Sequence, residues 1–181
     1  MTKITSVPTM IIAVSLIALV GGTVFASNKD TVAVPNGLAF SEFKGYEDWQ
    51  VITVSKAKVE NADVINVILG NPAMIEAFKA GFPDNGKPIP DGARMAKIHW
   101  NSKTNDTFPN HAIGPDTLHD IDFMVKDSKR FAATGGWGWA EFDYDTATDT
   151  FKPLGTGAAC GYACHTLVKS RDYVFTGYPK R

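Results

Sequence analysis

The chain has 181 residues with a formal net charge of −1 at pH 7, and 44% of its residues are hydrophobic. No basic stripe indicates nucleic-acid binding, no Gly-rich loop indicates phosphate binding, and there is no internal repeat or low-complexity linker. These features predict a compact globular protein that contacts no nucleic acid.

Residues 1–26 have the features of a signal peptide. Lys3 supplies a positive start, residues 10–20 form an uncharged apolar run, and residues 24–26 offer small side chains where a signal peptidase cuts. The run is shorter than the ~20 residues that a spanning helix needs, and an uncleaved membrane anchor is the alternative. We therefore expect export to the periplasm, contact with the membrane only through this signal peptide, and a mature chain of residues 27–181 that forms a single domain.

The mature chain is expected to alternate strands with short helices. β-Branched and aromatic runs predict strands at residues 51–54, 64–69, 93–102, 118–126 and 137–144. Capping residues and helical spacing predict helices at residues 41–49, 73–80, 127–131 and 158–168. Residues 82–92 and 103–116 are expected to be loops, and residues 173–176 an extended piece. Strands in runs with helices between them predict an α+β fold, a mostly antiparallel β-sheet with flanking helices.

Period-two alternation gives two of these strands a polar face. In the third predicted strand, Lys97 and His99 point away from the apolar side chains. In the fourth, Asp120 and Asp122 do the same. Both strands are therefore expected to turn one apolar face towards a core and to place ionisable groups on the other.

The run Cys-Gly-Tyr-Ala-Cys-His at residues 160–165 contains the only two cysteines of the chain. This CxxxCH run resembles CxxCH, the attachment pattern of a c-type haem, but has one residue more between its cysteines. Cys160 and Cys164 lie one helical turn apart, so their thiols can add to the two vinyl groups on one edge of a porphyrin, and His165 can ligate the iron. A redox pair or a structural disulfide is the alternative. The adjacent histidine, the absence of other cysteines and the export signal favour one covalently bound haem c.

Other side chains were weighed as iron ligands. His99, His111 and His119 show no metal-binding spacing, and lone histidines are more often structural or surface groups. Met95 or Met124 could be a sixth ligand, as in electron-transfer cytochromes. Methionines in strands more often fill the core, so we assign both to the core.

Several fragments resemble the cytochrome P460 family, in the family's order. They are Pro-Asp-Gly at 90–92 with Lys97 five residues later, Lys-Asp-Ser-Lys-Arg-Phe-Ala at 126–132, Trp-Gly-Trp-Ala at 137–140, the motif at 160–165 and Val-Phe-Thr at 174–176. Together they span nearly all of the mature chain. The resemblance implies a mostly antiparallel sheet, usually in a homodimer, with one c-type haem packed against it, histidine on one side and an open distal side.

The resemblance also assigns three residues to the haem surroundings. Lys97 falls where the family's catalytic members cross-link a lysine to the porphyrin; the alternative is an ordinary lysine on a solvated face. Asp122 aligns with the distal acidic residue, which is a glutamate in characterised members, and as a general base it would take protons from hydroxylamine. Aspartate reaches less far, and a surface carboxylate is the alternative. Asn66 stands where some members carry a distal arginine and suggests a pocket contact or a buried hydrogen bond.

Two functions follow from this resemblance. The first is a haem-iron oxidoreductase that oxidises hydroxylamine, in part with nitric oxide, and passes electrons to another cytochrome. The second, similar to the cytochromes c′-beta, is a protein that binds nitric oxide or another small gas without turning over hydroxylamine. We favour the enzyme.

Overall fold

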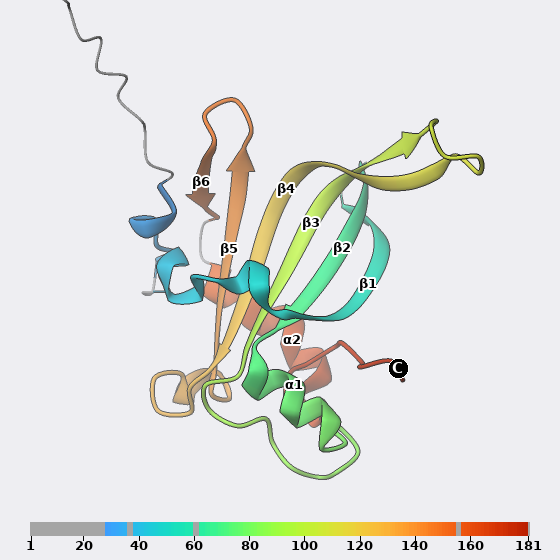
Figure 1. Cartoon of the computed structure of the whole chain (residues 1–181). Helices are drawn as coiled ribbons and strands as arrows, with labels where there is room; N and C mark the ends of the chain where they lie inside the picture. Colours follow the sequence, from blue (N-terminus) through green and yellow to red (C-terminus); the bar gives the residue numbers. More distant parts are fainter. Residues whose placement is uncertain (1–27, 36–37, 60–61, 155–156, 181) are drawn as a thin grey trace, which may run out of the picture.

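The computed structural model describes residues 28–35, 38–59, 62–154 and 157–180 (Figure 1). The predicted signal peptide lies outside these residues. Within them, one six-stranded antiparallel sheet has the strand order β1-β2-β3-β4-β5-β6. The strands are β1 (Gln50–Val59), β2 (Ala62–Gly70), β3 (Arg94–Asn105), β4 (Ala112–Lys126), β5 (Trp137–Asp145) and β6 (Thr150–Pro153). The predicted α+β fold is therefore confirmed.

Two α-helices and five 3-10 turns accompany the sheet in the described ranges. They are η1 (Asn28–Asp30), η2 (Phe40–Phe43), η3 (Tyr46–Asp48), α1 (Pro72–Lys79), η4 (Ala132–Thr134), α2 (Gly157–His165) and η5 (Thr166–Arg171). Helix α1 begins as the sequence predicts, because the Asn71 side chain accepts a hydrogen bond from the Met74 amide and Pro72 occupies the first turn. None of the helices in these ranges is both long and apolar enough to cross a membrane.

One face of the sheet is covered by the segment that contains η2 and η3 (Figure 1). Phe43 lies flat on Phe123 of β4, with ring centroids 4.1 Å apart and an interplanar angle of 13°. Phe40 packs edge-on against the same ring at 5.2 Å. This apolar layer contains the alternate residues of β3 and β4 that the sequence predicted to point inwards.

The other face carries α1, α2 and the C-terminal segment. Ile68, Met95 and Trp139 join the inner side of α1 and the buried residues Tyr173 and Val174 in a second apolar cluster. This face is apolar only at the end near the helices. The next residues on this face of β3, β4 and β5 are ionisable, so the candidate site lies where the two zones meet.

Several predicted elements differ from the structure. Residues 41–49 form two 3-10 turns rather than one helix, because Gly45 between them has a left-handed φ of 80°. Residues 127–131 form turns, and residues 173–176 lie outside the sheet. The predicted loop at 103–116 is shorter, because β3 and β4 continue into a hairpin that projects beyond the other strands (Figure 1). Strand β6 was not predicted.

Candidate haem site

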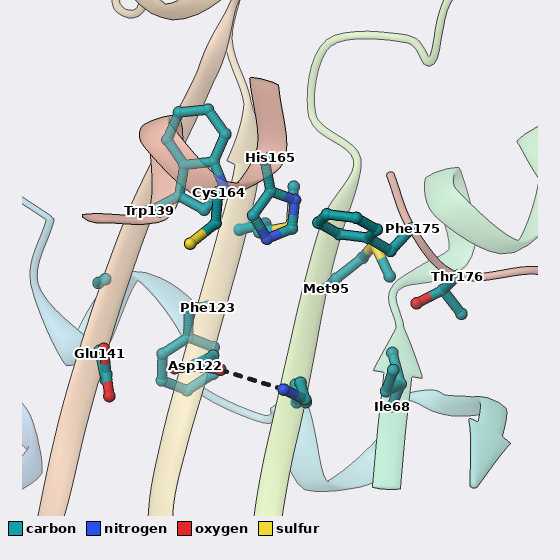
Figure 2. A pocket seen from close by; sticks show the side chains of 14 residues that line it. Ile68, Met95, Asp122, Phe123, Trp139, Glu141, Cys164, His165, Phe175 and Thr176 are labelled. Carbon is teal, nitrogen blue, oxygen red and sulfur yellow. Dashed lines mark ion pairs between the residues drawn. The ribbon is translucent and has the colours of Figure 1, made fainter. Parts of the chain in front are cut away.

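A cavity of about 450 Å³ lies between α2 and the mixed face of the sheet. This volume is within the range of small-molecule and cofactor pockets. Figure 2 shows Cys164 and His165 at the α2 end and Asp122 and Glu141 at the opposite end. The side chains and backbone that line it come from four strands, α2 and the C-terminal segment: Ile68, Met95, Lys97, Asp122, Phe123, Met124, Trp139, Ala140, Glu141, Gly161, Cys164, His165, Phe175 and Thr176.

Helix α2 packs on β5 through a glycine. A Cβ atom built on Gly161 would lie 2.4 Å from Cγ of Trp139, a distance that real side chains do not adopt. Glycine therefore lets the helix backbone rest on the indole ring. Cys164 is exposed, forms no disulfide within the described residues and borders the cavity. Cys160 lies on the same helix, but its side chain falls outside what the structure describes.

His165 is held in one orientation by the C-terminal segment. Its Nδ1 donates a hydrogen bond of 2.6 Å to the carbonyl oxygen of Tyr173, because a carbonyl can only accept. The imidazole also packs edge-on against Phe175 at 5.0 Å. The hydrogen bond to the Tyr173 carbonyl fixes the tautomer and leaves Nε2 unprotonated. Burial lowers the pKa of His165 and keeps the ring neutral. A neutral, oriented imidazole with a free nitrogen is what metal ligation requires.

Asp172 anchors the turn that presents the Tyr173 carbonyl. Its carboxylate accepts hydrogen bonds from the Ile89 amide at 2.8 Å, from Lys126 Nζ at 2.7 Å and from Trp137 Nε1 at 3.3 Å. Lys126 is 6% exposed, so this ion pair is buried at the C-terminal end of β4. The orientation of His165 therefore depends on a charge pair that links the C-terminal segment to β4.

Lys97 and Asp122 lie opposite each other on β3 and β4 and both line the cavity. Lys97 Nζ is 3.7 Å from Asp122 Oδ2, the contact that is dashed in Figure 2. Burial raises the pKa of Asp122, and the charges of His99 and Lys97 lower it in part. About a third of each side chain is exposed, and both border the cavity.

Asn66 is on the same face of the sheet but does not line the cavity. It is 4% exposed and pairs in register with His99 on β3. Its amide nitrogen donates a long hydrogen bond of 3.4 Å to Ser55 Oγ, and its Oδ1 has no hydrogen-bond partner among the described residues. The structure therefore brings Lys97, Asp122, Cys164 and His165 together and leaves Asn66 outside the cavity, two residues along β2 from Ile68, which pairs with Lys97.

Sequence reasoning did not single out Glu141, which lies opposite Asp122 on β5 and also borders the cavity. Burial, followed by the charges of Asp122, Asp120 and Asp143, raises the pKa of Glu141 to about 7. Its signal was present in the sequence, because alternation in β5 places it on the face of Trp139. The sequence does not show, however, that β5 pairs with β4 and so places Glu141 next to Asp122.

The cavity has the properties that a c-type haem needs. Its walls at the α2 end are apolar, and the buried Nε1 atom of Trp139 has no hydrogen-bond partner within the described ranges, as expected at a surface that a further group covers. Cys164 offers a thiol and His165 offers a free Nε2 on the same side. Met95 and Met124 lie in the floor as members of the apolar cluster.

Comparison with known proteins gives one family. A family model described as Cytochrome P460 matches residues 43–176, which includes every strand, both α-helices and all the candidate site residues. No curated protein matches the chain.

Proposed function

The chain belongs to the cytochrome P460 family and is a haem cytochrome; we propose that it holds one haem covalently and oxidises hydroxylamine, in part with nitric oxide. One observation carries the finer proposal. Lys97 and Asp122, which the family resemblance assigns to the cross-link and the distal acid, meet at 3.7 Å in the cavity that Cys164 and His165 also line.

Four side chains of the chain would hold the haem. Cys160 and Cys164 would bind the porphyrin edge, His165 would ligate the iron through Nε2, and Lys97 would form a third bond to the ring. Bound haem supplies a redox-active iron that withdraws electrons from a nitrogen ligand. The hydrogen bond from His165 Nδ1 to Tyr173 supports the proximal role, because a second partner of this kind orients a ligating imidazole.

Asp122 would accept protons from the substrate. Hydroxylamine loses protons as it loses electrons, and a carboxylate at the reacting end of the cavity can take them as a general base. Burial raises the pKa of Asp122, which makes its carboxylate a stronger base than an ordinary aspartate. Before it bonds to the ring, the ammonium group of Lys97 on the next strand holds the carboxylate on the cavity side.

We also propose the surroundings in which this reaction takes place. The signal-like residues 1–26 support export to the periplasm and cleavage, which leaves residues 27–181 as one domain. Electrons need an external acceptor, for which another cytochrome is suited. The family resemblance supports a homodimer.

Binding of nitric oxide without turnover is the second candidate. It is favoured by Asn66, which stands in place of the family's distal arginine and, in this structure, does not line the cavity. The cytochromes c′-beta that this candidate resembles cap the distal pocket with phenylalanines, and the phenylalanines of this lining disfavour it: the Phe123 ring packs on Phe43 on the opposite face of the sheet, and Phe175 packs on His165. Neither ring caps the Asp122 end of the cavity.

The test is hydroxylamine oxidation by the purified holoprotein with an artificial electron acceptor. Asp122→Asn keeps the size of the side chain and removes the base, so we expect the rate to fall at least about 100-fold. Asp106→Asn, in the exposed β3–β4 turn, is the matched control and should not change it. An unchanged rate in Asp122→Asn would remove Asp122 from the mechanism. A wild-type protein that binds nitric oxide but oxidises no hydroxylamine would leave the second candidate.

A further inference from the structure

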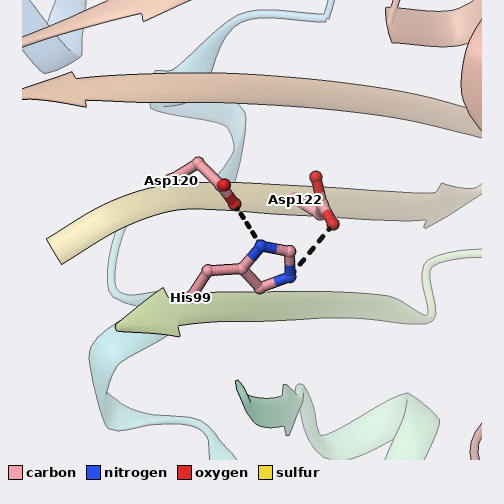
Figure 3. Close-up of side chains that lie close together, drawn as sticks. All are labelled: His99, Asp120 and Asp122. Atoms are coloured by element: carbon pink, nitrogen blue, oxygen red, sulfur yellow. Dashed lines mark ion pairs between the residues drawn. The ribbon is translucent and has the colours of Figure 1, made fainter. Parts of the chain in front are cut away.

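Acidic and imidazole side chains alternate along the sheet, starting from Asp122. Asp122 Oδ2 is 3.5 Å from His99 Nε2, and His99 Nδ1 is 2.6 Å from Asp120 Oδ1 (Figure 3). Asp120 Oδ2 is in turn 2.5 Å from Nδ1 of His119. His99 and Asp120 are 6% and 3% exposed, whereas the side chain of His119 is 35% exposed. The series therefore leads from the cavity through buried groups to solvent.

We propose that His99, Asp120 and His119 form a proton-transfer chain that connects Asp122 with solvent. This inference rests on the proposed function, because a base that takes protons from a substrate must release them before the next turnover. Asp122 would be the catalytic residue. The other three would act through it.

A β-bulge brings His119 into contact with the other residues of the proton-transfer chain. Residue 99 of β3 pairs with residue 120 of β4, but residue 100 pairs with residue 118, so His119 is the extra residue of the bulge. In a regular strand, neighbouring side chains point to opposite faces, and His119 could not contact the carboxylate of Asp120. Bulges redirect side chains in this way and are common beside active sites.

The two buried residues of the proton-transfer chain, His99 and Asp120, do not make a well-aligned hydrogen bond through their closest atoms. Both ring nitrogens of His99 and Oδ1 of Asp120 lack an aligned hydrogen bond within the described residues, although 2.6 Å separates the two groups. A purely structural role would be served by aligned bonds, because unsatisfied buried polar atoms are costly. Groups that exchange a proton need a short distance between them, and 2.6 Å separates His99 Nδ1 from Asp120 Oδ1.

The charges around Asp120 stabilise an additional proton on the neighbouring histidines. Burial alone would raise the pKa of Asp120, but the contacts and charges of His99 and His119 outweigh it and lower the pKa. Asp120 therefore stays ionised and stabilises an added proton on either ring. The other groups that face the chain are Lys97 from β3, Asn66 from β2, Glu141 and Asp143 from β5, Lys152 from β6 and His165 from α2.

Each passage moves one proton and no electrons. Asp122 gives its proton to His99 Nε2, while the proton on Nδ1 passes to Asp120 Oδ1. Rotation of this carboxyl group presents the proton to His119, whose solvent-exposed ring turns so that its unprotonated Nε2 accepts it, and the proton on Nδ1 leaves to water. Exchange of ring protons with water then restores the first tautomers of both histidines, and Asp122 is again a carboxylate.

Proton uptake after flash reduction of the holoprotein tests the chain without hydroxylamine. Reduction lowers the positive charge beside Asp122, so this group should take up a proton, which a pH-indicator dye follows in time. We expect His119→Gln and His99→Gln to slow the uptake at least about tenfold, and added imidazole to restore it in His119→Gln. His111→Gln, on the exposed β3–β4 turn, is the control and should behave as wild type.

The outcomes separate this inference from the proposed function. Uptake at the wild-type rate in His119→Gln, or no uptake by the wild-type protein, would overturn the chain. A stoichiometric divalent cation bound to His99 and Asp120 in the purified protein would also overturn it. Slow uptake in His119→Gln would support the chain even if hydroxylamine were not oxidised, in which case only the proposed substrate would be lost. If His99→Gln fails to fold, His119→Gln decides alone.

Discussion

The Asp172→Asn variant tests whether a buried ion pair holds the segment that orients His165. Lys126 Nζ lies 2.7 Å from Asp172, and the two side chains are only 8% and 14% exposed. Removing one member of a buried pair costs about 3–5 kcal/mol, because the other charge stays buried. The Gly135 carbonyl, 3.1 Å from Nζ, remains as a partner, so we expect the lower value, about 3 kcal/mol of unfolding free energy.

Chemical denaturation of the holoprotein at pH 7 measures this loss. Asparagine is a fair replacement because residue 172 has a left-handed φ of 46°, which asparagine tolerates. Asp149→Asn is the matched control: this residue also has a left-handed φ, 52°, but it is exposed, and we expect a change within about 0.5 kcal/mol. A loss below about 1 kcal/mol in Asp172→Asn would refute the reasoning, since Lys126 would then not depend on this partner.

Two further variants test the cavity walls. The pKa of Glu141, about 7 in the folded protein against an ordinary 4.5, means that the folded state binds more protons between these values, so stability falls as the pH rises through them. Glu141→Gln should remove this fall. After allowance for partial solvent access, its free energy of unfolding near pH 8, measured by denaturation, should exceed that of wild type by roughly 1–2 kcal/mol. Equal pH dependence in both proteins would contradict this. Gly161→Ala should lower the free energy of unfolding by about 1–3 kcal/mol and lower the melting temperature, because the added Cβ would lie 2.4 Å from Trp139. Gly177→Ala is the control: nothing lies within 4 Å of its added Cβ, so it should have the melting temperature of wild type.

Local patterns in the sequence predicted the faces of the sheet well. Alternation placed Lys97 and His99 on one side of β3 and Asp120 and Asp122 on the same side of β4, and the register confirms it. This succeeded because period-two alternation is a property of each strand alone. Helix α1 was predicted for the same kind of reason, since Asn71 and Pro72 cap it locally.

Features that depend on pairing between distant segments could not be predicted. The bulge at His119 appears only when β4 is aligned with β3, and Glu141 joins the site only because β5 pairs with β4. Asp172 contacts Lys126 and Ile89, which lie 46 and 83 residues away. No local signal marks such contacts. Strand β6 has four residues and was likewise too short to show a pattern.

The most direct test of the account is the mass of the haem-bearing peptides after denaturation and proteolysis of the mature holoprotein. We expect one fragment in which a single haem joins the peptide containing Lys97 to the peptide containing residues 160–165. Haem attached to Cys160 and Cys164 alone, together with an unmodified Lys97 peptide, would contradict the assignment of Lys97 and leave a gas-binding cytochrome as the remaining function.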